Sequence, residues 1–527
     1  MKSRSKNIFM ALLTLPMALT MLGVARPGAG GPAVDADSYP SIGKEEMGQL
    51  IWTLRIADQE LDDFSNLEAL DQAGMTAYRY GIAFHTYFLA TEQYHKLPAC
   101  SSIIGPRMDR LIRRMVRKPV WEYWAETSKG IYYLEPRMNK PWPANHDPVS
   151  FQNIMYSGHL GQMIGLYETL YRDLKWDRAG SIVFEWSADE KYVYDNYSLQ
   201  KVMYDQMAAP PHCIPCEPNA CFPECNQHPV LSFMLYDLLH GTHLADVREQ
   251  FMEFFLAKKM IDPKNHETAA LYLIKQDLTL RQRDPRFGNA YDLLLVPAVA
   301  TGALKIYSSS ANGWTGTMMH AWQPEYIEQQ YPYQLKHHLV EMKDDEARLK
   351  KDSFEPRLQY GFFAMLAGEV GDRDTRDKLI TYADAKYGPA WKDGAFVYPF
   401  DKAKQCTGLS GVLLAIARAN PEDGFWKLHN RPFDDAHFQE PAVESVDFPN
   451  VLLSRAIYDR DQQALVITTL PGAQKGGKTS LGIGRLTPAK SYAVFVDSER
   501  KETVSQKSGI EVEVPLDGEH DVIVQAM

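Results

Sequence analysis

Residues 153–170 read NIMYSGHLGQMIGLYETL and predict a long buried helix. Apolar residues recur there at three- and four-residue spacing, as in a helix packed on a core. The same spacing is present in residues 49–55, 75–92, 108–116, 250–260, 357–370 and 408–420. Clusters of Pro, Gly and Asn separate these segments, and no sequence period recurs. Paired helices over this length favour an α/α toroid or a large helical bundle.

The composition is that of a globular enzyme-sized protein with two domains. The chain has 527 residues, of which 45% are hydrophobic and 23% are charged. The formal net charge of −11 argues against nucleic acid or an anionic membrane surface as a partner, because either would require a basic face.

The first 25 residues have the layout of a secretory signal peptide. Lys2, Arg4 and Lys6 precede an apolar run over residues 8–22, and small residues follow it. The run is shorter than the roughly 20 residues that a membrane helix needs. We therefore expect a signal peptide or an N-terminal anchor over residues 1–25, no other membrane span, and a periplasmic or secreted protein.

The composition changes near residue 445. Residues 450–471, 490–497 and 509–525 alternate apolar and polar side chains and are rich in Val and Ile. This pattern predicts an antiparallel β-sandwich-like domain over residues 445–527, after a helical domain over residues 40–440. We expect this β domain to have a packing role rather than a catalytic one.

The thiol loop, residues 212–228, reads HCIPCEPNACFPECNQH and contains Cys213, Cys216, Cys221 and Cys225. Four interpretations are open from residue types alone. The cysteines could bind zinc, although the two ligand pairs lie unusually close together. They could form a structural disulfide, act as a functional thiol pair, or be inert buried thiols.

Several motifs resemble the linalool dehydratase/isomerase family. CEPNACFPECN, residues 216–226, resembles its C-E-P-x-x-x-F-x-x-C-N motif, and NIMYSGHL, residues 153–160, resembles its N-I-M-Y-x-G-H-L segment. Weaker similarities lie at residues 79–84, 120–121, 236–242 and 261–263. The resemblance covers roughly residues 45–430, and the C-terminal β-like segment has no counterpart in it.

The resemblance implies roles for particular residues. Cys216, Cys225 and His159 match the catalytic cysteines and histidine of the family, and Asp58 aligns with its catalytic aspartate. Substrate-pocket tyrosines are implied at Tyr80 and Tyr291.

Three further residues are candidates for the substrate pocket. Phe64 stands where the family has a tyrosine, which makes it a candidate specificity residue. On the predicted helix, Tyr156 and Met163 lie on the same face as His159, so we expect them in the same pocket.

Two thiols, an imidazole and a carboxylate can remove water from an alkenol without a metal or a redox cofactor. One group protonates the leaving hydroxyl and another takes a neighbouring proton. We therefore expect a hydro-lyase/isomerase that acts on a small apolar, terpenoid-like alcohol or alkene, and the resemblance implies a homo-oligomer.

Two alternatives stay open. A helical toroid followed by a β domain is also similar to polysaccharide lyases and related glycan-processing proteins. The chain could instead be a secreted binding protein whose thiol loop is only a disulfide staple.

Overall fold

The structure, a computed structural model, describes residues 32, 34–67, 71–72, 75–130, 142–281, 307–352, 355–401 and 403–527. Residues 1–25 and Tyr291, on which two of the predictions rest, lie outside these ranges. Within the described ranges, no helix is both long enough and apolar enough to span a membrane.

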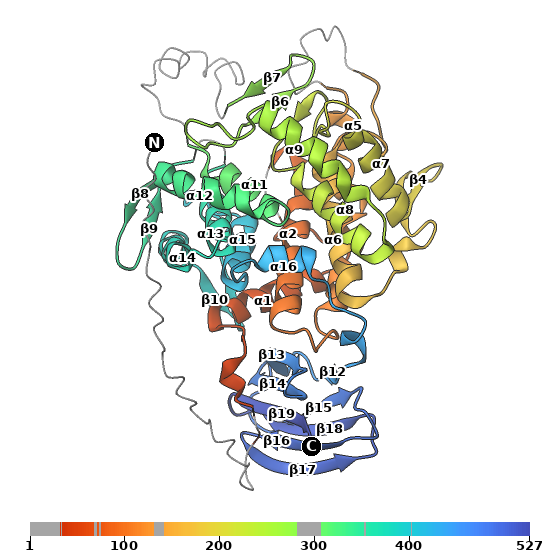
Figure 1. Ribbon diagram of the computed structural model, residues 1–527, viewed down its shortest axis with the longest axis vertical. Coiled ribbons are helices and arrows are strands. Elements are labelled where there is room, and N and C mark those ends of the chain that lie inside the picture. The colour runs from red at the N-terminus through yellow and green to blue at the C-terminus, as the bar shows by residue number, and fades with distance from the viewer. Residues whose placement is uncertain are drawn as a thin grey trace, which may run out of the picture.

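Helices form the larger part of the molecule and occupy the upper part of Figure 1. The α-helices are α1 (Lys44–Asp58), α2 (Tyr78–His95), α3 (Gly105–Met115), α4 (Lys118–Trp121), α5 (Trp124–Thr127), α6 (Ile154–Tyr171), α7 (Asn196–Ala208), α8 (Gln227–His240), α9 (Arg248–Ala257), α11 (Ser309–His320), α12 (Pro324–His338), α13 (Gln359–Glu369), α14 (Arg373–Tyr387), α15 (Gly408–Ala419) and α16 (Gly424–Asn430). Short 3-10 turns are η1 (Ala36–Ser38), η2 (Lys175–Asp177), η3 (Leu244–Val247) and η5 (His437–Gln439).

Six of these helices contact one another in a closed order: α2, α6, α8, α11, α13, α15 and back to α2. Each has a neighbour outside this order, for example α3 beside α2, α12 beside α11 and α14 beside α13. Helix α6 is buried along its whole length up to Leu170, as its sequence predicts. The inner faces of the six helices therefore build one shared interior.

Three glycines of α6 allow it to lie close to α8. A Cβ atom at Gly158 would lie 3.0 Å from Pro229 Cδ, and one at Gly165 would lie 2.8 Å from Leu235 Cβ. A Cβ at Gly161 would collide with the Ser232 hydroxyl. Real Cβ atoms pack less tightly than this, so larger residues would push the two helices apart. The close approach brings His159 of α6 next to His228 of α8.

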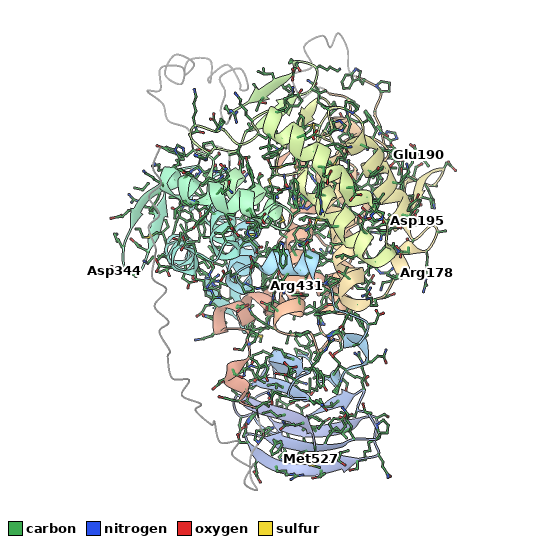
Figure 2. All side chains as sticks on the ribbon, viewed as in Figure 1. Arg178, Glu190, Asp195, Asp344, Arg431 and Met527 are labelled. Atoms are coloured by element: carbon green, nitrogen blue, oxygen red, sulfur yellow. The ribbon has the colours of Figure 1, made fainter. Side chains whose placement is uncertain are left out.

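Short strands decorate the helical part. They are β1 (Asp71–Gln72), β2 (Met75–Thr76), β3 (Ile182–Ser187), β4 (Glu190–Tyr194), β5 (Ala220–Cys221), β6 (Leu271–Leu273), β7 (Leu278–Leu280), β8 (Leu339–Met342), β9 (Ala347–Leu349), β10 (Ala390–Lys392) and β11 (Ala395–Val397). All their pairings are antiparallel. Figure 2 shows Glu190 of β4 and Asp195, which caps α7, at the outer edge of the helical part.

The C-terminal strands form two antiparallel sheets below the helices in Figure 1. One sheet has the order β12-β15-β18 and the other has the order β13-β14-β19-β16-β17. Their bounds are β12 (Ala442–Val446), β13 (Val451–Asp459), β14 (Ala464–Pro471), β15 (Lys478–Gly484), β16 (Ser491–Val496), β17 (Glu499–Ser505), β18 (Ile510–Pro515) and β19 (His520–Ala526). Alternating apolar residues of both sheets belong to the main hydrophobic core.

Backbone hydrogen bonds join the sheets to the helical part. The segment after α2 donates from Ala99 N to the Ala456 carbonyl at 2.9 Å, and Val443 N donates to the Ala99 carbonyl at 2.8 Å. Ala456 N also donates to the Lys96 carbonyl at 2.9 Å. The segment around Val34 and Ala36 packs on the five-stranded sheet. The segment after α2 is thus hydrogen-bonded to one strand of each sheet, β12 and β13.

The prediction of a helix-rich chain with antiparallel strands at its C-terminal end is confirmed. Sequence reasoning missed β12, β15 and β17, and it also missed α7, α11, α12 and α14. Strand β17 is exposed at five consecutive positions and its first four residues are charged, so it lacks the apolar alternation that marks a half-buried strand.

Candidate active site

The side chain of Asn226 holds the two ends of the thiol loop together. Its Oδ1 accepts a hydrogen bond from Ile214 N at 2.7 Å, and its Nδ2 donates to the Ile214 carbonyl at 2.9 Å. A further hydrogen bond from Nδ2 to the Phe222 carbonyl measures 3.0 Å. A side-chain amide that bonds to both the N–H and the carbonyl of one residue replaces the hydrogen bonds that a neighbouring strand would make. Cys225, directly before Asn226, is therefore held against the segment that leads to Cys216.

Cys216 and Cys225 form a buried pair of free thiols, with exposed fractions of 1% and 4%. Burial and a hydrogen bond to Cys225 raise the pKa of Cys216 well above its ordinary value. Burial also raises the pKa of Cys225, and the nearby carboxyl groups of Glu224 and Glu217 add to the effect. Both thiols are therefore protonated at neutral pH, so they can donate a proton but are poor nucleophiles.

A buried cation lies beside this pair. Arg79 is 1% exposed, and its guanidinium lies 4.5 Å from the centre of the Tyr80 ring and 4.0 Å from that of Tyr123. Burial alone would lower the pKa of Arg79, but the two tyrosines and Glu217 raise it overall. The charge is thus held between aromatic rings and a carboxyl group, as a buried cation requires.

Tyr80 connects the thiols to His159. Burial raises the pKa of Tyr80 well above its ordinary value, and Cys225 and Cys216 act on it in the same direction. The Tyr80 ring meets the His159 ring edge-on, with 5.5 Å between the centres. The thiol loop and α6 therefore contribute to one interior site through this tyrosine of α2.

His159 is fully buried and neutral. Burial, together with His228 and Arg79, lowers the pKa of His159 well below its ordinary value. Its Nδ1 lies 2.8 Å from the hydroxyl of Tyr87, while its Nε2 is buried without a hydrogen-bond partner among the described residues. A buried polar atom without a partner is uncommon in folded proteins. In the tautomer whose Nδ1–H donates to Tyr87, Nε2 is a free proton acceptor.

A row of hydrogen bonds fixes His228, whose imidazole lies against that of His159. The rings of His228 and His159 have centres 3.7 Å apart. Trp314 Nε1 donates to His228 Nε2 at 3.0 Å, and His228 Nδ1 lies 2.6 Å from Gln162 Oε1. Because an indole nitrogen only donates, His228 Nε2 must accept and Nδ1 must carry the proton.

The row continues from Gln162 to the backbone of α16. Gln162 Nε2 lies 2.9 Å from His429 Nε2, and His429 Nδ1 lies 2.8 Å from the Phe425 carbonyl. Every donor in the row therefore points from Trp314 toward Phe425. Burial lowers the pKa of His228 to about 3 and that of His429 to about 4, so both imidazoles are neutral.

The arrangement combines neutral thiols, which can donate protons, with a neutral imidazole, which can accept one. Phe84 and Trp314 complete the wall around His159, with ring centres 5.9 and 6.1 Å away. A largely apolar interior with one donor pair and one acceptor suits acid–base chemistry on an apolar substrate.

The structure brings together four of the residues predicted for the site: Cys216, Cys225, His159 and Tyr80. Met163 is buried one turn further along α6. Tyr156 is also buried, but its hydroxyl donates to the Met115 carbonyl at 2.8 Å and its ring contacts Phe184.

Two predicted residues lie apart from this group. Asp58 ends α1 with its side chain 47% exposed, and it pairs with Arg107 at 2.8 Å. It lines a cavity between α1 and the C-terminal sheets. Phe64 stacks on Tyr78 with 4.8 Å between the ring centres, and the Arg114 guanidinium lies 5.5 Å from its ring. Their catalytic and substrate roles stay predictions.

Sequence reasoning missed the functional candidates that contact His159 or act electrostatically on the thiols and His159: Arg79, Tyr87, Tyr123, His228 and Trp314. Two of these carried a signal. Arg79 precedes Tyr80 in the motif of residues 79–84, and a charged residue in an apolar run is rarely buried unless it is paired. His228 closes the thiol loop.

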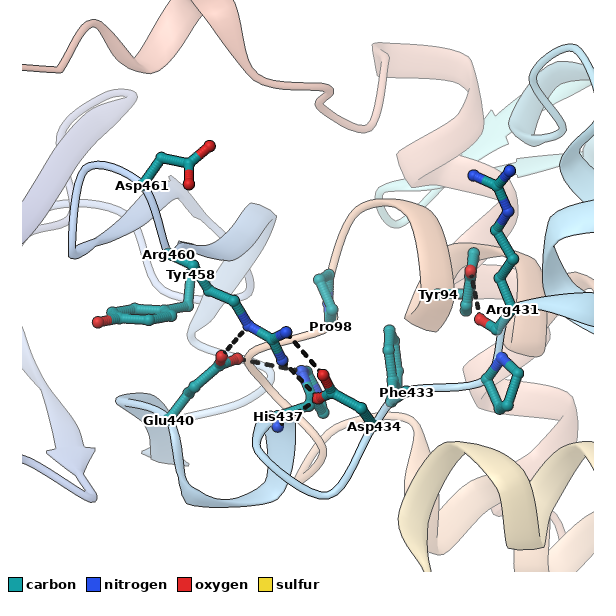
Figure 3. Close-up of a pocket in the computed structure, with 11 residues that line it drawn as sticks. Tyr94, Pro98, Arg431, Phe433, Asp434, His437, Glu440, Tyr458, Arg460 and Asp461 are labelled. Atoms are coloured by element: carbon teal, nitrogen blue, oxygen red, sulfur yellow. Dashed lines mark hydrogen bonds and ion pairs between the residues drawn. The ribbon is translucent and has the colours of Figure 1, made fainter. Parts of the chain in front are cut away.

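A cavity with a volume of about 430 Å³ and mainly apolar walls adjoins the thiol loop. Trp124, Trp142, Phe151, Ile274 and Asn219 line it, and Asn219 lies between Cys216 and Cys225 in the sequence. A larger cavity of about 510 Å³ lies where the helices meet the sheets, and there Arg460 pairs with Asp434 and Glu440 (Figure 3). That polar cavity contains none of the thiol-site residues.

Two groups of potential metal ligands occur in the described part of the chain. They are Glu267, His337 and His338, and Glu168, Asp177 and His240. The thiol loop does not bring three of its sulfur atoms within 4.8 Å of one another, as a four-cysteine zinc site would. In the first group, Asn312 Nδ2 lies 3.0 Å from His338 Nε2, so His338 Nδ1 carries the proton and is not a free ligand.

Comparison with known proteins gives one family. The model of the linalool dehydratase/isomerase family matches residues 79–311 and 298–404, which is more than half of the chain. The matched residues include His159, Cys216 and Cys225, and they exclude Asp58 and the C-terminal sheets.

Similarities to solved structures are distant. An inactive variant of the alpha-1,6-mannanase GH76A of Salegentibacter sp. HEL1_6, bound to alpha-1,6-mannotetrose, is 13% identical with a TM-score of 0.39, over 71% of this chain and 98% of that one. The Lin0763 protein of Listeria innocua is 9% identical with a TM-score of 0.39, over 70% and 96%. Dfg5 of Chaetomium thermophilum, bound to glucosamine, is 12% identical with a TM-score of 0.38, over 73% and 89%. Scores this low carry no argument about this chain.

Proposed function

Because the chain belongs to the linalool dehydratase/isomerase family, we propose that it is a hydro-lyase/isomerase whose substrate is a small apolar alkenol. The observation that carries the proposal is a buried group of two neutral thiols, Tyr80 and an imidazole whose Nε2 has no hydrogen-bond partner within the described ranges. Such groups move protons, which is what adding water to an alkene or removing it from an alkenol requires.

The helices of the site support an α/α toroid as the catalytic scaffold. His159, Tyr80, His228 and Trp314 come from α6, α2, α8 and α11, four of the six helices in the closed order. We propose that these helices form the inner layer of the toroid. The thiol loop closes one end of the shared interior, directly before α8.

In the proposed reaction one thiol of the Cys216–Cys225 pair is the general acid. It donates its proton to the leaving hydroxyl, and the other thiol donates a hydrogen bond to the developing thiolate. The carbon–oxygen bond breaks and water leaves. His159 Nε2 takes a proton from the neighbouring carbon, and the electrons of that C–H bond form the new double bond. Each well-placed acid or base contributes about 10²–10⁴-fold.

Arg79 favours a concerted course. A free carbocation would form near a fixed positive charge in a medium of low dielectric constant, where like charges repel strongly. Tyr80 and Tyr123 already place their rings against the guanidinium. Proton donation and proton removal that overlap in time would limit the positive charge that develops on carbon.

The apolar cavity beside Asn219 is the proposed approach for substrate. Its walls are mainly indole, phenyl and aliphatic groups, and it adjoins the thiol loop. We also propose that Met163 and Tyr156 shape the far side of the site through packing. Phe64 instead stacks on Tyr78, and Asp58 pairs with Arg107.

The test incubates the reduced full-length protein anaerobically with linalool, geraniol and short tertiary alkenols, and measures alkenes in the headspace. We expect a diene product from at least one alkenol, and we expect its loss in Cys216→Ala and in Cys225→Ala. Cys406→Ala is the matched control, because Cys406 is also a buried free thiol but lies outside the thiol loop. Full activity in the Cys216→Ala/Cys225→Ala double variant would refute the thiol mechanism.

A further inference from the structure

Two cysteines of the thiol loop have no role in the proposed chemistry. The Sγ atoms of Cys213 and Cys221 lie 2.7 Å apart, and the two side chains are 3% and 1% exposed. Cys213 lies three residues before Cys216, and Cys221 lies four residues before Cys225. The loop therefore contains two pairs of thiols rather than one group of four.

The surrounding backbone holds Cys213 and Cys221 in place. Cys221 belongs to β5 and pairs with Tyr272 of β6. Cys213 directly precedes Ile214, whose N–H and carbonyl both bond to Asn226. The two residues thus face each other from anchored positions. A disulfide bond is about 2.05 Å long, so the sulfur atoms would need to approach by less than about 1 Å.

We propose that Cys213 and Cys221 form a disulfide bridge in the mature protein, while Cys216 and Cys225 stay thiols. Four cysteines allow about three complete pairings. The 2.7 Å contact pairs Cys213 with Cys221, and no three sulfur atoms of the loop lie within 4.8 Å of one another. The bridge itself does not depend on the proposed function; its benefit to Cys216 does.

The bridge forms by exchange with a disulfide donor, such as glutathione disulfide or a protein disulfide. One thiolate attacks the donor and the second then displaces the donor sulfur. One S–S bond forms between the two Sγ atoms, the donor S–S bond breaks, and the donor leaves as two thiols that carry the two protons. Both cysteines are buried after folding, so the exchange takes place before the loop packs. The extracytoplasmic location proposed from residues 1–25 would supply such donors.

The bridge protects the proposed catalytic thiol. Cys213 and Cys216 are separated by Ile214 and Pro215, and this spacing is that of C-x-x-C redox pairs. A free Cys213 could therefore exchange into a bridge with Cys216 under oxidising conditions. Once bonded to Cys221, Cys213 no longer offers that partner.

Two-step labelling tests the proposal. The full chain is folded in a mixture of reduced and oxidised glutathione, unfolded in iodoacetamide, reduced, and then treated with N-ethylmaleimide. No Lys or Arg lies between Lys201 and Arg248, so a single tryptic peptide carries all four cysteines and fragmentation reads each label. We expect maleimide on Cys213 and Cys221 and acetamide on Cys216 and Cys225. Acetamide on Cys213 or Cys221 in most molecules would overturn the bridge.

Two variants make the result independent of catalysis. In Cys216→Ala/Cys225→Ala we expect maleimide on both remaining loop cysteines, and acetamide on them would overturn the pairing. In Cys221→Ser we expect Cys216 to gain maleimide label, because Cys213 is then free to pair with it. The matched control Cys213→Ser/Cys221→Ser should leave Cys216 with acetamide. Absence of turnover in every protein would refute the proposed function and leave these labels unchanged.

Discussion

Tyr87→Phe tests whether His159 is held by a single hydroxyl. The substitution removes the oxygen that lies 2.8 Å from Nδ1 and leaves the ring packing in place. His159 has no exposed surface, so water cannot replace the lost partner. An unsatisfied buried polar group costs about 1–3 kcal/mol, and hydrogen bonds to a charged ring are about twice as strong as neutral ones.

The effect should appear in the chemical step. Since about 1.36 kcal/mol corresponds to tenfold in rate, we expect kcat to fall by about 10- to 100-fold. KM should change by less than about threefold, because the hydroxyl contacts the imidazole rather than the substrate. The assay is initial-rate headspace analysis with whichever alkenol the wild type converts, together with thermal melting of both proteins.

Tyr171→Phe is the matched control. Tyr171 ends α6, the helix that carries His159. Its hydroxyl donates to Gln93 Oε1 at 3.0 Å, away from His159. It should lower the melting temperature without changing kcat. Wild-type kcat in Tyr87→Phe, alongside an inactive His159→Phe, would show that Tyr87 does not orient the base.

Three further predictions follow from buried or paired groups. Burial raises the pKa of Glu224 from 4.5 to about 8, so its contribution to stability is complete below pH 4.5 and is lost as pH rises toward 8. The free energy of unfolding of Glu224→Gln should therefore gain about 3 kcal/mol relative to wild type between pH 4.5 and 7, as measured in urea titrations. A difference that does not depend on pH would refute this. Gln162→Leu should cost about 2–5 kcal/mol in the same titrations, because two buried imidazoles lose their partner, and a cost under about 1 kcal/mol would contradict the hydrogen-bond row. Asp58→Asn should change stability by less than about 1 kcal/mol, because Asp58 is 47% exposed where it pairs with Arg107. A loss of turnover beyond about tenfold in that variant would then report on the chemistry of Asp58.

Sequence periodicity located the main helices well because their buried faces repeat along the chain. The helix expected at residues 153–170 is α6, Ile154–Tyr171. The one expected at residues 75–92 begins three residues later, as α2, because Met75 and Thr76 pair in a short strand. His338 lies in the polar stretch Lys336-His337-His338 but is fully buried, because α12 turns it toward Glu267 and Asn312.

The candidate site was only partly accessible to sequence reasoning, because its contacts join distant residues. The motif cysteines and His159 could be named from resemblance alone. The Tyr87 hydroxyl that contacts His159 lies 72 positions away in sequence, and Trp314 lies 86 positions from the His228 that it contacts. No local pattern distinguishes these residues from ordinary core aromatics.

The hydrogen-bond row from Trp314 through His228 and Gln162 to His429 does not transfer protons. Its only link between the two imidazoles is a carboxamide, and a carboxamide does not pass protons along as a hydroxyl or a water does. Reversing the direction of these hydrogen bonds would require the Gln162 amide to rotate and Trp314 Nε1 to accept a hydrogen bond, which an indole N–H cannot do. The row therefore blocks proton transfer between His228 and His429. His159 therefore exchanges protons at Nδ1, which meets the Tyr87 hydroxyl, or at Nε2, and not through this row.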